Sequence, residues 1–214
     1  MTRITVLGGT GYAGGAVVRE AASRGHHVVS FSRNAPGEEV AGVETVTGSA
    51  LVRADLERAV RDAEVVVVAL APSGVLADDF VELNAQIADL ARGVGARLGV
   101  IGGAGTLLLA EDGPKVYETP EFPERFRGFS RASDGVLQVL RDSEPGLDWF
   151  VLSPPRSFGH WAPGEATGKY RVGDDVVLTD EKGEEAISGP DFATALVDEI
   201  ERPAHHRRRF TVAY

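Results

Sequence analysis

The sequence predicts an α/β protein in which a mainly parallel β-sheet is covered by helices on both faces. Short apolar runs alternate with segments of helical periodicity, and a glycine-rich segment joins the first run to the first helical segment. The runs are apolar almost throughout, Val65–Val68 being the clearest. A sheet that is buried on both faces requires such strands, whereas a sheet with one exposed face would show alternating polarity.

The first half of the chain contains a regular alternation of predicted elements. Apolar runs predict the strands, and the spacing of apolar residues by three or four positions predicts the helices. In chain order we expect strand Ile4–Leu7, helix Tyr12–Arg24, strand Val28–Phe31, strand Val43–Val46, helix Leu51–Arg61, strand Val65–Leu70, helix Phe80–Arg92 and strand Leu98–Ile101.

Beyond Gly102 the pattern is looser, and we expect this part to form a small C-terminal extension on the substrate side, built mainly from residues 103–190. Residues 1–214 are expected to form a single domain. The predicted elements are a loop Gly103–Pro123, helix Phe129–Arg141, strand Asp148–Leu152, a hairpin of Tyr170–Val172 with Val176–Leu178, helix Phe192–Ile200 begun by Ser188, and strand Phe210–Val212.

Composition excludes several classes of function. The chain has no cysteine, which rules out disulfides, thiol nucleophiles and thiolate metal ligands. A net charge of -10 opposes nucleic-acid binding, and the one basic cluster, His205–Arg209, is expected to be a solvated edge. Asp78 and Asp79 have no partners at ligand spacing, so no metal is predicted. Without a membrane span or signal peptide, the expected location is the cytoplasm.

The glycine-rich segment lies between the first predicted strand and the first predicted helix, which is the context that a dinucleotide-binding turn requires. Small residues allow the backbone to turn tightly and to approach a pyrophosphate, whose charge is met by the amides at the helix start. The fold is therefore expected to be a doubly wound sheet of Rossmann type. The predicted cofactor-binding residues in this turn are Gly8, Thr10, Gly11, Tyr12, Ala13 and Gly14.

The end of the second predicted strand favours NADP(H) over NAD(H). An Asp or Glu at this place accepts hydrogen bonds from the ribose hydroxyls of NAD, but here the chain has Ser32 followed by Arg33. Arg33, together with Ser32, suits a 2′-phosphate instead. NAD(H) remains the alternative cofactor.

Several motifs together resemble the atypical short-chain dehydrogenase/reductase group. More narrowly, the chain looks like NAD(P)H-binding proteins described as NADH-flavin reductases, which are related to flavin/biliverdin reductases and NmrA-like proteins. The resemblance extends nearly from end to end. The motifs are the glycine-rich turn, Ser32-Arg33, Gly48-Ser49-Ala50-Leu51, Ile101-Gly102-Gly103-Ala104-Gly105, Thr119-Pro120-Glu121-Phe122-Pro123 and Leu152-Ser153-Pro154-Pro155.

This resemblance implies the rest of the cofactor site. It places adenine beside Ser49 and Ala50, although relatives commonly have Asp at the position of Ser49, so only the place and not a side-chain contact carries over. It places the middle of the cofactor beside Ala69, Leu70 and Ala71. It places the nicotinamide near Ser153, Pro154 and Pro155.

No catalytic residue is identified. The Tyr-x-x-x-Lys pair of the short-chain dehydrogenases is absent at every tyrosine. Candidate proton donors are Lys115, Tyr117 and His160. Aromatic side chains that could hold a flat acceptor are Phe126, Phe129, Phe158 and Trp161.

Three functions remain open. The first is an NADPH-dependent reductase acting on a flavin, a quinone or a similar conjugated acceptor, for which solvent can supply the proton. The second is an NmrA-like regulator that senses the redox state of NADP(H) without turnover. The third is a sugar-nucleotide epimerase or dehydratase, which should need the absent pair. The sequence leaves open whether the protein is a monomer or a homodimer.

Overall fold

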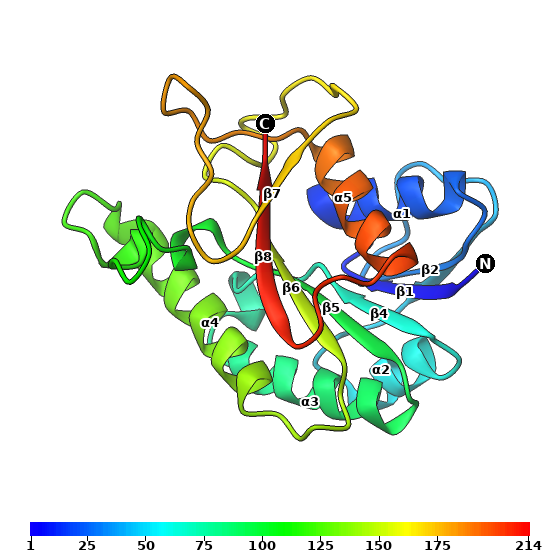
Figure 1. Cartoon of the computed structure of the whole chain (residues 1–214). Helices are drawn as coiled ribbons and strands as arrows, with labels where there is room; N and C mark the ends of the chain where they lie inside the picture. Colours follow the sequence, from blue (N-terminus) through cyan, green and yellow to red (C-terminus); the bar gives the residue numbers. More distant parts are fainter.

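The structure, a computed structural model, describes all residues from Met1 to Tyr214. Eight strands form one sheet in the order β3-β2-β1-β4-β5-β6-β8-β7 (Figure 1). All neighbouring strands are parallel except β7, which is antiparallel to β8. The strands are β1 (Arg3–Leu7), β2 (His27–Ser32), β3 (Val43–Thr47), β4 (Val65–Val68), β5 (Arg97–Ile101), β6 (Trp149–Ser153), β7 (Arg171–Gly173) and β8 (Arg208–Ala213).

Five α-helices cover both faces of the sheet (Figure 1). Helices α1 and α5 lie on one face, and α2, α3 and α4 lie on the other. The predicted doubly wound α/β fold is therefore confirmed. No helix combines the length and the apolar character that crossing a bilayer demands. The helices are α1 (Tyr12–Ser23), α2 (Arg53–Val60), α3 (Phe80–Gly93), α4 (Glu124–Arg141) and α5 (Gly189–Glu201), with short 3₁₀ turns η1 (Gly74–Leu76), η2 (Ala104–Thr106) and η3 (Val116–Glu118).

Strand β4 shows why the central strands are apolar throughout. Val65 and Val67 belong to the buried cluster shared with α1 and α5, whereas Val66 and Val68 belong to the cluster shared with α2, α3 and α4. Successive side chains of a strand point to opposite faces, so a strand covered on both sides must be apolar at every position.

The connection between β2 and β3 contains no helix. Residues 33–42 cross from one parallel strand to the next as an irregular segment beside the start of α1. Val40 and Val43 pack against the buried apolar cluster that the sheet shares with α1 and α5. This part of the sheet face is therefore covered by a thin loop rather than by a helix.

The predicted hairpin of Tyr170–Val172 with Val176–Leu178 is wrong. Instead, β7 pairs with β8, and the second segment turns away to the loop after β5. There the Val177 amide donates a hydrogen bond of 2.9 Å to the Leu108 carbonyl. The open backbone edge of β8 offers β7 a longer partner than its sequence neighbour does, and strand pairing of this kind leaves no local sequence signal.

The basic cluster His205–Arg209 is not a solvated edge throughout. Arg209 is only 6% exposed, because β8 lies between β6 and β7 and this position faces inward. Its guanidinium pairs with Asp175 and donates a hydrogen bond of 2.7 Å to the Thr106 carbonyl. A buried charge requires such partners, and here they tie the last strand to the loops beside it.

Candidate functional site

The segments predicted to bind a cofactor all follow parallel strands, so the structure brings them to the same edge of the sheet. The carboxyl ends of parallel strands meet there, and this edge is the usual place for a ligand in open α/β sheets. The segments are Gly8–Gly14 after β1, Ser32-Arg33 at the end of β2, Ser49-Ala50 after β3, Ala69–Ala71 after β4 and Ser153–Pro155 at the end of β6.

Three glycines of the turn are required by the protein's own packing. Gly8 has φ +90°, and a Cβ there would lie 2.6 Å from the Ala69 carbonyl oxygen. A Cβ on Gly9 would lie 2.3 Å from the Ser30 hydroxyl, and one on Gly14 would lie 2.2 Å from the Gly8 carbonyl oxygen. The turn therefore lies against its neighbours, and the start of α1 against Gly8 directly after β1, more closely than side chains at these positions would allow.

Gly11 differs from these glycines because its own neighbours leave room for a Cβ. The nearest atom would be the Gly8 carbonyl oxygen at 3.3 Å, and φ is -74°. Gly11 is the N-cap of α1, no side chain caps the helix, and its first turn contains no acidic residue. The first backbone hydrogen bond of the helix is donated by the Gly15 amide to the Gly11 carbonyl. The earlier amides are thus available to an anion.

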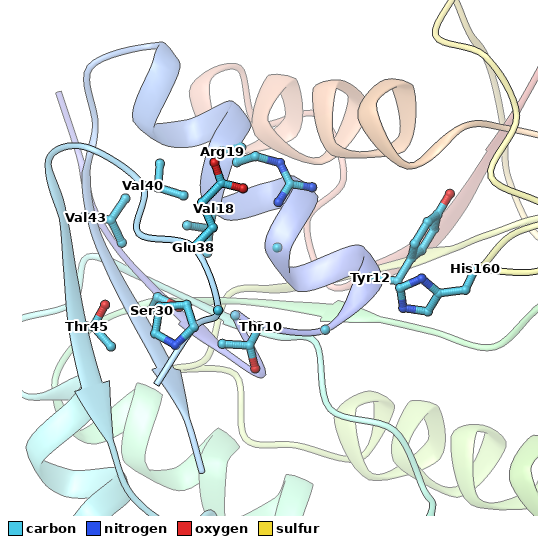
Figure 2. Close-up of a pocket in the computed structure, with 15 residues that line it drawn as sticks. Thr10, Tyr12, Val18, Arg19, Ser30, Glu38, Val40, Val43, Thr45 and His160 are labelled. Carbon is cyan, nitrogen blue, oxygen red and sulfur yellow. The ribbon is translucent and has the colours of Figure 1, made fainter. Parts of the chain in front are cut away.

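A cavity of about 260 Å³ adjoins this turn (Figure 2). It lies between the start of α1 and the β2–β3 connection, and Thr10, Gly11 and Tyr12 are the predicted residues that line it. The remaining lining residues, which sequence reasoning missed apart from His160, are Gly9, Gly15, Val18, Arg19, Ser30, Pro36, Gly37, Glu38, Val40, Val43, Thr45 and His160.

Ser32 and Arg33, predicted to select NADP(H), have different surroundings. Ser32 is buried, and its hydroxyl donates a hydrogen bond of 2.6 Å to the Asn34 carbonyl. Arg33 is exposed and makes no hydrogen bond or ion pair. Of the two, only Arg33 presents a free charge at the sheet edge.

The segments after β3 and β4 present mainly backbone to the edge. The Ser49 amide donates to the Asp55 carboxylate at 2.9 Å, and the Ser49 hydroxyl accepts from the Leu51 amide at 3.3 Å. Ala50 is buried in the core cluster on the α2 side. After β4, Ala69 and Leu70 are half-buried and Ala71 is exposed.

Ser153, Pro154 and Pro155 are all buried at the end of β6. The Ser153 hydroxyl has no hydrogen-bond partner, and a Cβ on Gly102 would lie 2.6 Å from its oxygen. Leaving a buried hydroxyl unpaired costs about 1–3 kcal/mol. No group of the protein competes for this hydroxyl.

The Tyr12 side chain connects the start of α1 with the start of α5. Its hydroxyl donates to the Pro163 carbonyl at 3.2 Å and accepts from the Gly189 amide at 3.0 Å. Its ring meets Phe158 and His160 edge-on, with centroids 5.2 and 4.9 Å apart. The side chain therefore has a packing role, and the Tyr12 amide is the group left for a phosphate.

Two of the candidate proton donors converge on one carboxylate. The Lys115 ammonium and the Tyr117 hydroxyl lie 2.5 and 3.2 Å from Oδ2 of Asp134 on α4. Burial raises the pKa of Tyr117, and the neighbouring Asp134 charge raises it further. Tyr117 thus keeps its proton but directs it toward Asp134. The third candidate, His160, lines the cavity.

The candidate aromatic wall is not one surface. Phe158 is buried against Tyr12 and Phe192, which is ordinary packing. In contrast, Trp161 is 77% exposed, and Phe126 and Phe129 on α4 are 46% and 39% exposed. Only these three rings are available to an acceptor.

Comparison with known proteins identifies relatives of the whole chain. The model of a family described as NAD(P)H-binding matches residues 8–203. The uncharacterized protein YwnB of Bacillus subtilis (strain 168) is 32% identical over 214 residues, which cover 98% of this chain and 97% of YwnB.

Two solved structures share both fold and sequence with this chain. A protein described as a candidate epimerase, from Bacteroides thetaiotaomicron, has a TM-score of 0.89 and 28% identity, covering 100% of this chain and 97% of its own. A protein described as a candidate NADH-flavin reductase, from Streptococcus pneumoniae TIGR4, has a TM-score of 0.83 and 29% identity, covering 100% and 99%.

Proposed function

The chain belongs to the NAD(P)H-binding family, and on that premise we propose that it is a reductase that uses NADPH to reduce a flavin, a quinone or a similar small conjugated acceptor. The similar structure named as an NADH-flavin reductase supports the flavin as one such acceptor. The proposed binding residues are those of the five segments at the carboxyl edge of the sheet.

One observation carries this proposal: at Gly11 the protein leaves open a space that its own packing does not need. Gly8, Gly9 and Gly14 are crowded by backbone or side chain, but Gly11 is not. An unused opening beside uncapped helix amides is what a pyrophosphate requires. When bound, a reduced nicotinamide supplies the hydride.

The chemistry requires little from side chains of the protein. Reduction of a conjugated acceptor depends on hydride geometry, because solvent can protonate the product. The Lys115 ammonium and the Tyr117 hydroxyl both contact Asp134, so the Tyr117 proton is directed to that carboxylate. We therefore assign the residues of this chain to binding and orientation, with Ser153 at the proposed nicotinamide end.

The preference for NADPH is proposed on the basis of Arg33. It is exposed, makes no ion pair, and stands where β2 reaches the edge of the sheet. A guanidinium binds a phosphate through charge-assisted hydrogen bonds. No carboxylate follows β2 directly, so the residues at the end of this strand do not offer the ribose hydroxyls of NADH an acceptor.

The test follows absorbance at the nicotinamide band while purified protein is mixed with NADPH and a panel of flavins, quinones and dyes. We expect oxidation with at least one acceptor, and loss of oxidation in Gly11→Val. A wild-type protein that binds no dinucleotide would overturn the proposal. Oxidation that persists in Gly11→Val would show that another place binds the cofactor.

The redox-sensing regulator is the second candidate. The absence of the Tyr-x-x-x-Lys pair and the contact of Tyr117 with Asp134 fit it as readily as they fit a reductase that takes its proton from solvent. Tight NADPH binding with discrimination between NADP and NADPH, and no oxidation across the panel, would identify this function. The epimerase hypothesis, despite the similarly named structure, lacks the Tyr-x-x-x-Lys pair that such chemistry should use.

A further inference from the structure

The cavity beside the glycine-rich turn contains an arginine that reaches back along α1. Side chains on a helix point toward its N-terminus, so Arg19 covers the turn before it. Gly15, one turn earlier, has no side chain to obstruct the guanidinium. A Cβ added at Gly15 would lie 3.4 Å from Nη1 of Arg19 and 3.5 Å from the Gly9 carbonyl oxygen. Figure 2 shows the guanidinium beside α1 at the cavity.

This arginine has no partner within the protein. Arg24, the C-cap of the same helix, pairs with Glu20, Asp198 and Glu201, whereas Arg19 makes no ion pair or hydrogen bond. A cation directed toward a helix N-terminus also opposes the helix dipole. Both facts favour an anion between the guanidinium and the first amides of α1.

The opposite wall of the cavity contributes a carboxylate. Glu38 comes from the β2–β3 connection, lines the cavity and makes no ion pair or hydrogen bond either. The sequence has no carboxylate directly after β2, but the path of the loop returns Glu38 to the turn. Carboxylates near this position accept hydrogen bonds from ribose hydroxyls and repel a phosphate.

The size of the cavity suits part of a dinucleotide rather than a whole ligand. Its volume of about 260 Å³ lies below the range of roughly 300–1,000 Å³ that is typical of pockets for drug-sized molecules. Thr10 and Gly11 line it and directly precede the first residue of α1. A molecule whose phosphates meet the helix amides would therefore extend directly into this space.

We propose that Arg19 and Glu38 together set the preference between the two nicotinamide dinucleotides, Arg19 by pairing with the 2′-phosphate of NADP(H) and Glu38 by favouring the free ribose hydroxyls of NAD(H). This inference rests on the proposed function. It adds to Arg33, which lies at the sheet edge but does not line the cavity. The cavity thus holds one determinant for each cofactor.

Isothermal titration calorimetry with NADP⁺ and NAD⁺ tests this assignment in the wild type, Arg19→Gln and Glu38→Gln. Arg19→Gln should raise the Kd for NADP⁺ about tenfold and change that for NAD⁺ less than about twofold. Glu38→Gln should lower the Kd for NADP⁺ and raise that for NAD⁺. Arg61→Gln is the matched control: it removes the same charge from an exposed site at the end of α2 and should leave the ratio unchanged.

Failure of this inference differs from failure of the function on which it rests. If the wild type binds and Arg19→Gln leaves the ratio of the two Kd values unchanged, or shifts it no more than Arg61→Gln does, then Arg19 does not recognise the 2′-phosphate. An unchanged ratio in Glu38→Gln excludes the role of Glu38. If the wild type binds neither dinucleotide, the proposed function and this inference fall together.

Discussion

Replacing Gly11 and Gly14 separately by alanine should separate cofactor binding from folding, although both glycines belong to the same turn. A methyl group at Gly14 would lie 2.2 Å from the Gly8 carbonyl oxygen and 2.9 Å from its carbonyl carbon. These are backbone atoms that cannot rotate away. A methyl group at Gly11 would meet only the Gly8 carbonyl oxygen, at 3.3 Å.

The expected losses of stability differ accordingly. Overpacking costs about 1–3 kcal/mol, and we expect Gly14→Ala at or above about 3 kcal/mol because backbone must move. At roughly 2–4 °C per kcal/mol for a chain of this size, its Tm should fall by about 6–12 °C. Alanine is a poorer N-cap than glycine, so Gly11→Ala should lose only about 1 kcal/mol, or roughly 2–4 °C.

For NADPH binding, in contrast, we expect the larger loss in Gly11→Ala. The methyl group of Gly11→Ala occupies the space proposed for the pyrophosphate, so the Kd for NADPH should rise at least about tenfold, equivalent to about 1.4 kcal/mol. Thermal unfolding followed by circular dichroism and calorimetric titration measure the two effects. Gly128→Ala is the control, since Gly128 is exposed in α4 with open space around it and alanine should raise or preserve Tm.

Two results would refute this reasoning. If Gly11→Ala binds NADPH as tightly as the wild type, the opening at Gly11 does not serve the phosphates. If Gly14→Ala has the same Tm as the Gly128→Ala control, the close approach of α1 to the end of β1 does not require glycine.

Three further predictions concern selectivity and stability. Wild-type protein should bind NADPH at least about tenfold more tightly than NADH, and Arg33→Ala should weaken NADPH alone; equal affinities in a titration would contradict this. Burial alone would raise the pKa of Asp191, but hydrogen bonds from the Tyr214 hydroxyl and backbone amides outweigh it and lower this pKa. The resulting stability is complete above the unfolded pKa of about 3.9 and is lost as the pH falls through the lower folded pKa, so Tm of Asp191→Asn should fall less steeply in acid than that of the wild type. Asp175→Ala should cost about 3 kcal/mol in urea unfolding because it leaves Arg209 buried without its counter-charge, and a loss below about 1 kcal/mol would contradict that.

The fold was predictable because its signals are local. Val65–Val68 is apolar on both faces, and the glycines from Gly8 to Gly14 follow the first strand directly. Helix α4 begins earlier than the predicted Phe129, at Glu124, after Pro123 as N-cap. Apolar periodicity marks only the buried part of a helix, so its solvent-exposed first turn left no such signal.

The errors and omissions concern contacts between distant segments. The pairing of β7 with β8 depends on a strand about forty positions away, which the turn residues after Val172 do not reveal. Arg209 looked solvated because its partner Asp175 is equally remote. Arg19 was the one omission with a usable signal: it lies one turn after Gly15 on the predicted helix.

The irregular segment between β2 and β3 has a consequence for how relatives of this protein could diverge. From residue 33 to residue 42, the only hydrogen bond between two backbone groups joins the Val43 amide to the Val40 carbonyl. Loops with so few backbone hydrogen bonds tolerate changes in length and composition, while the sheet beneath keeps its register. Grafting this stretch from one relative into another should therefore transfer the contributions of Arg33 and Glu38 to nucleotide selectivity, though not that of Arg19 on α1, without redesign of the hydrophobic interior.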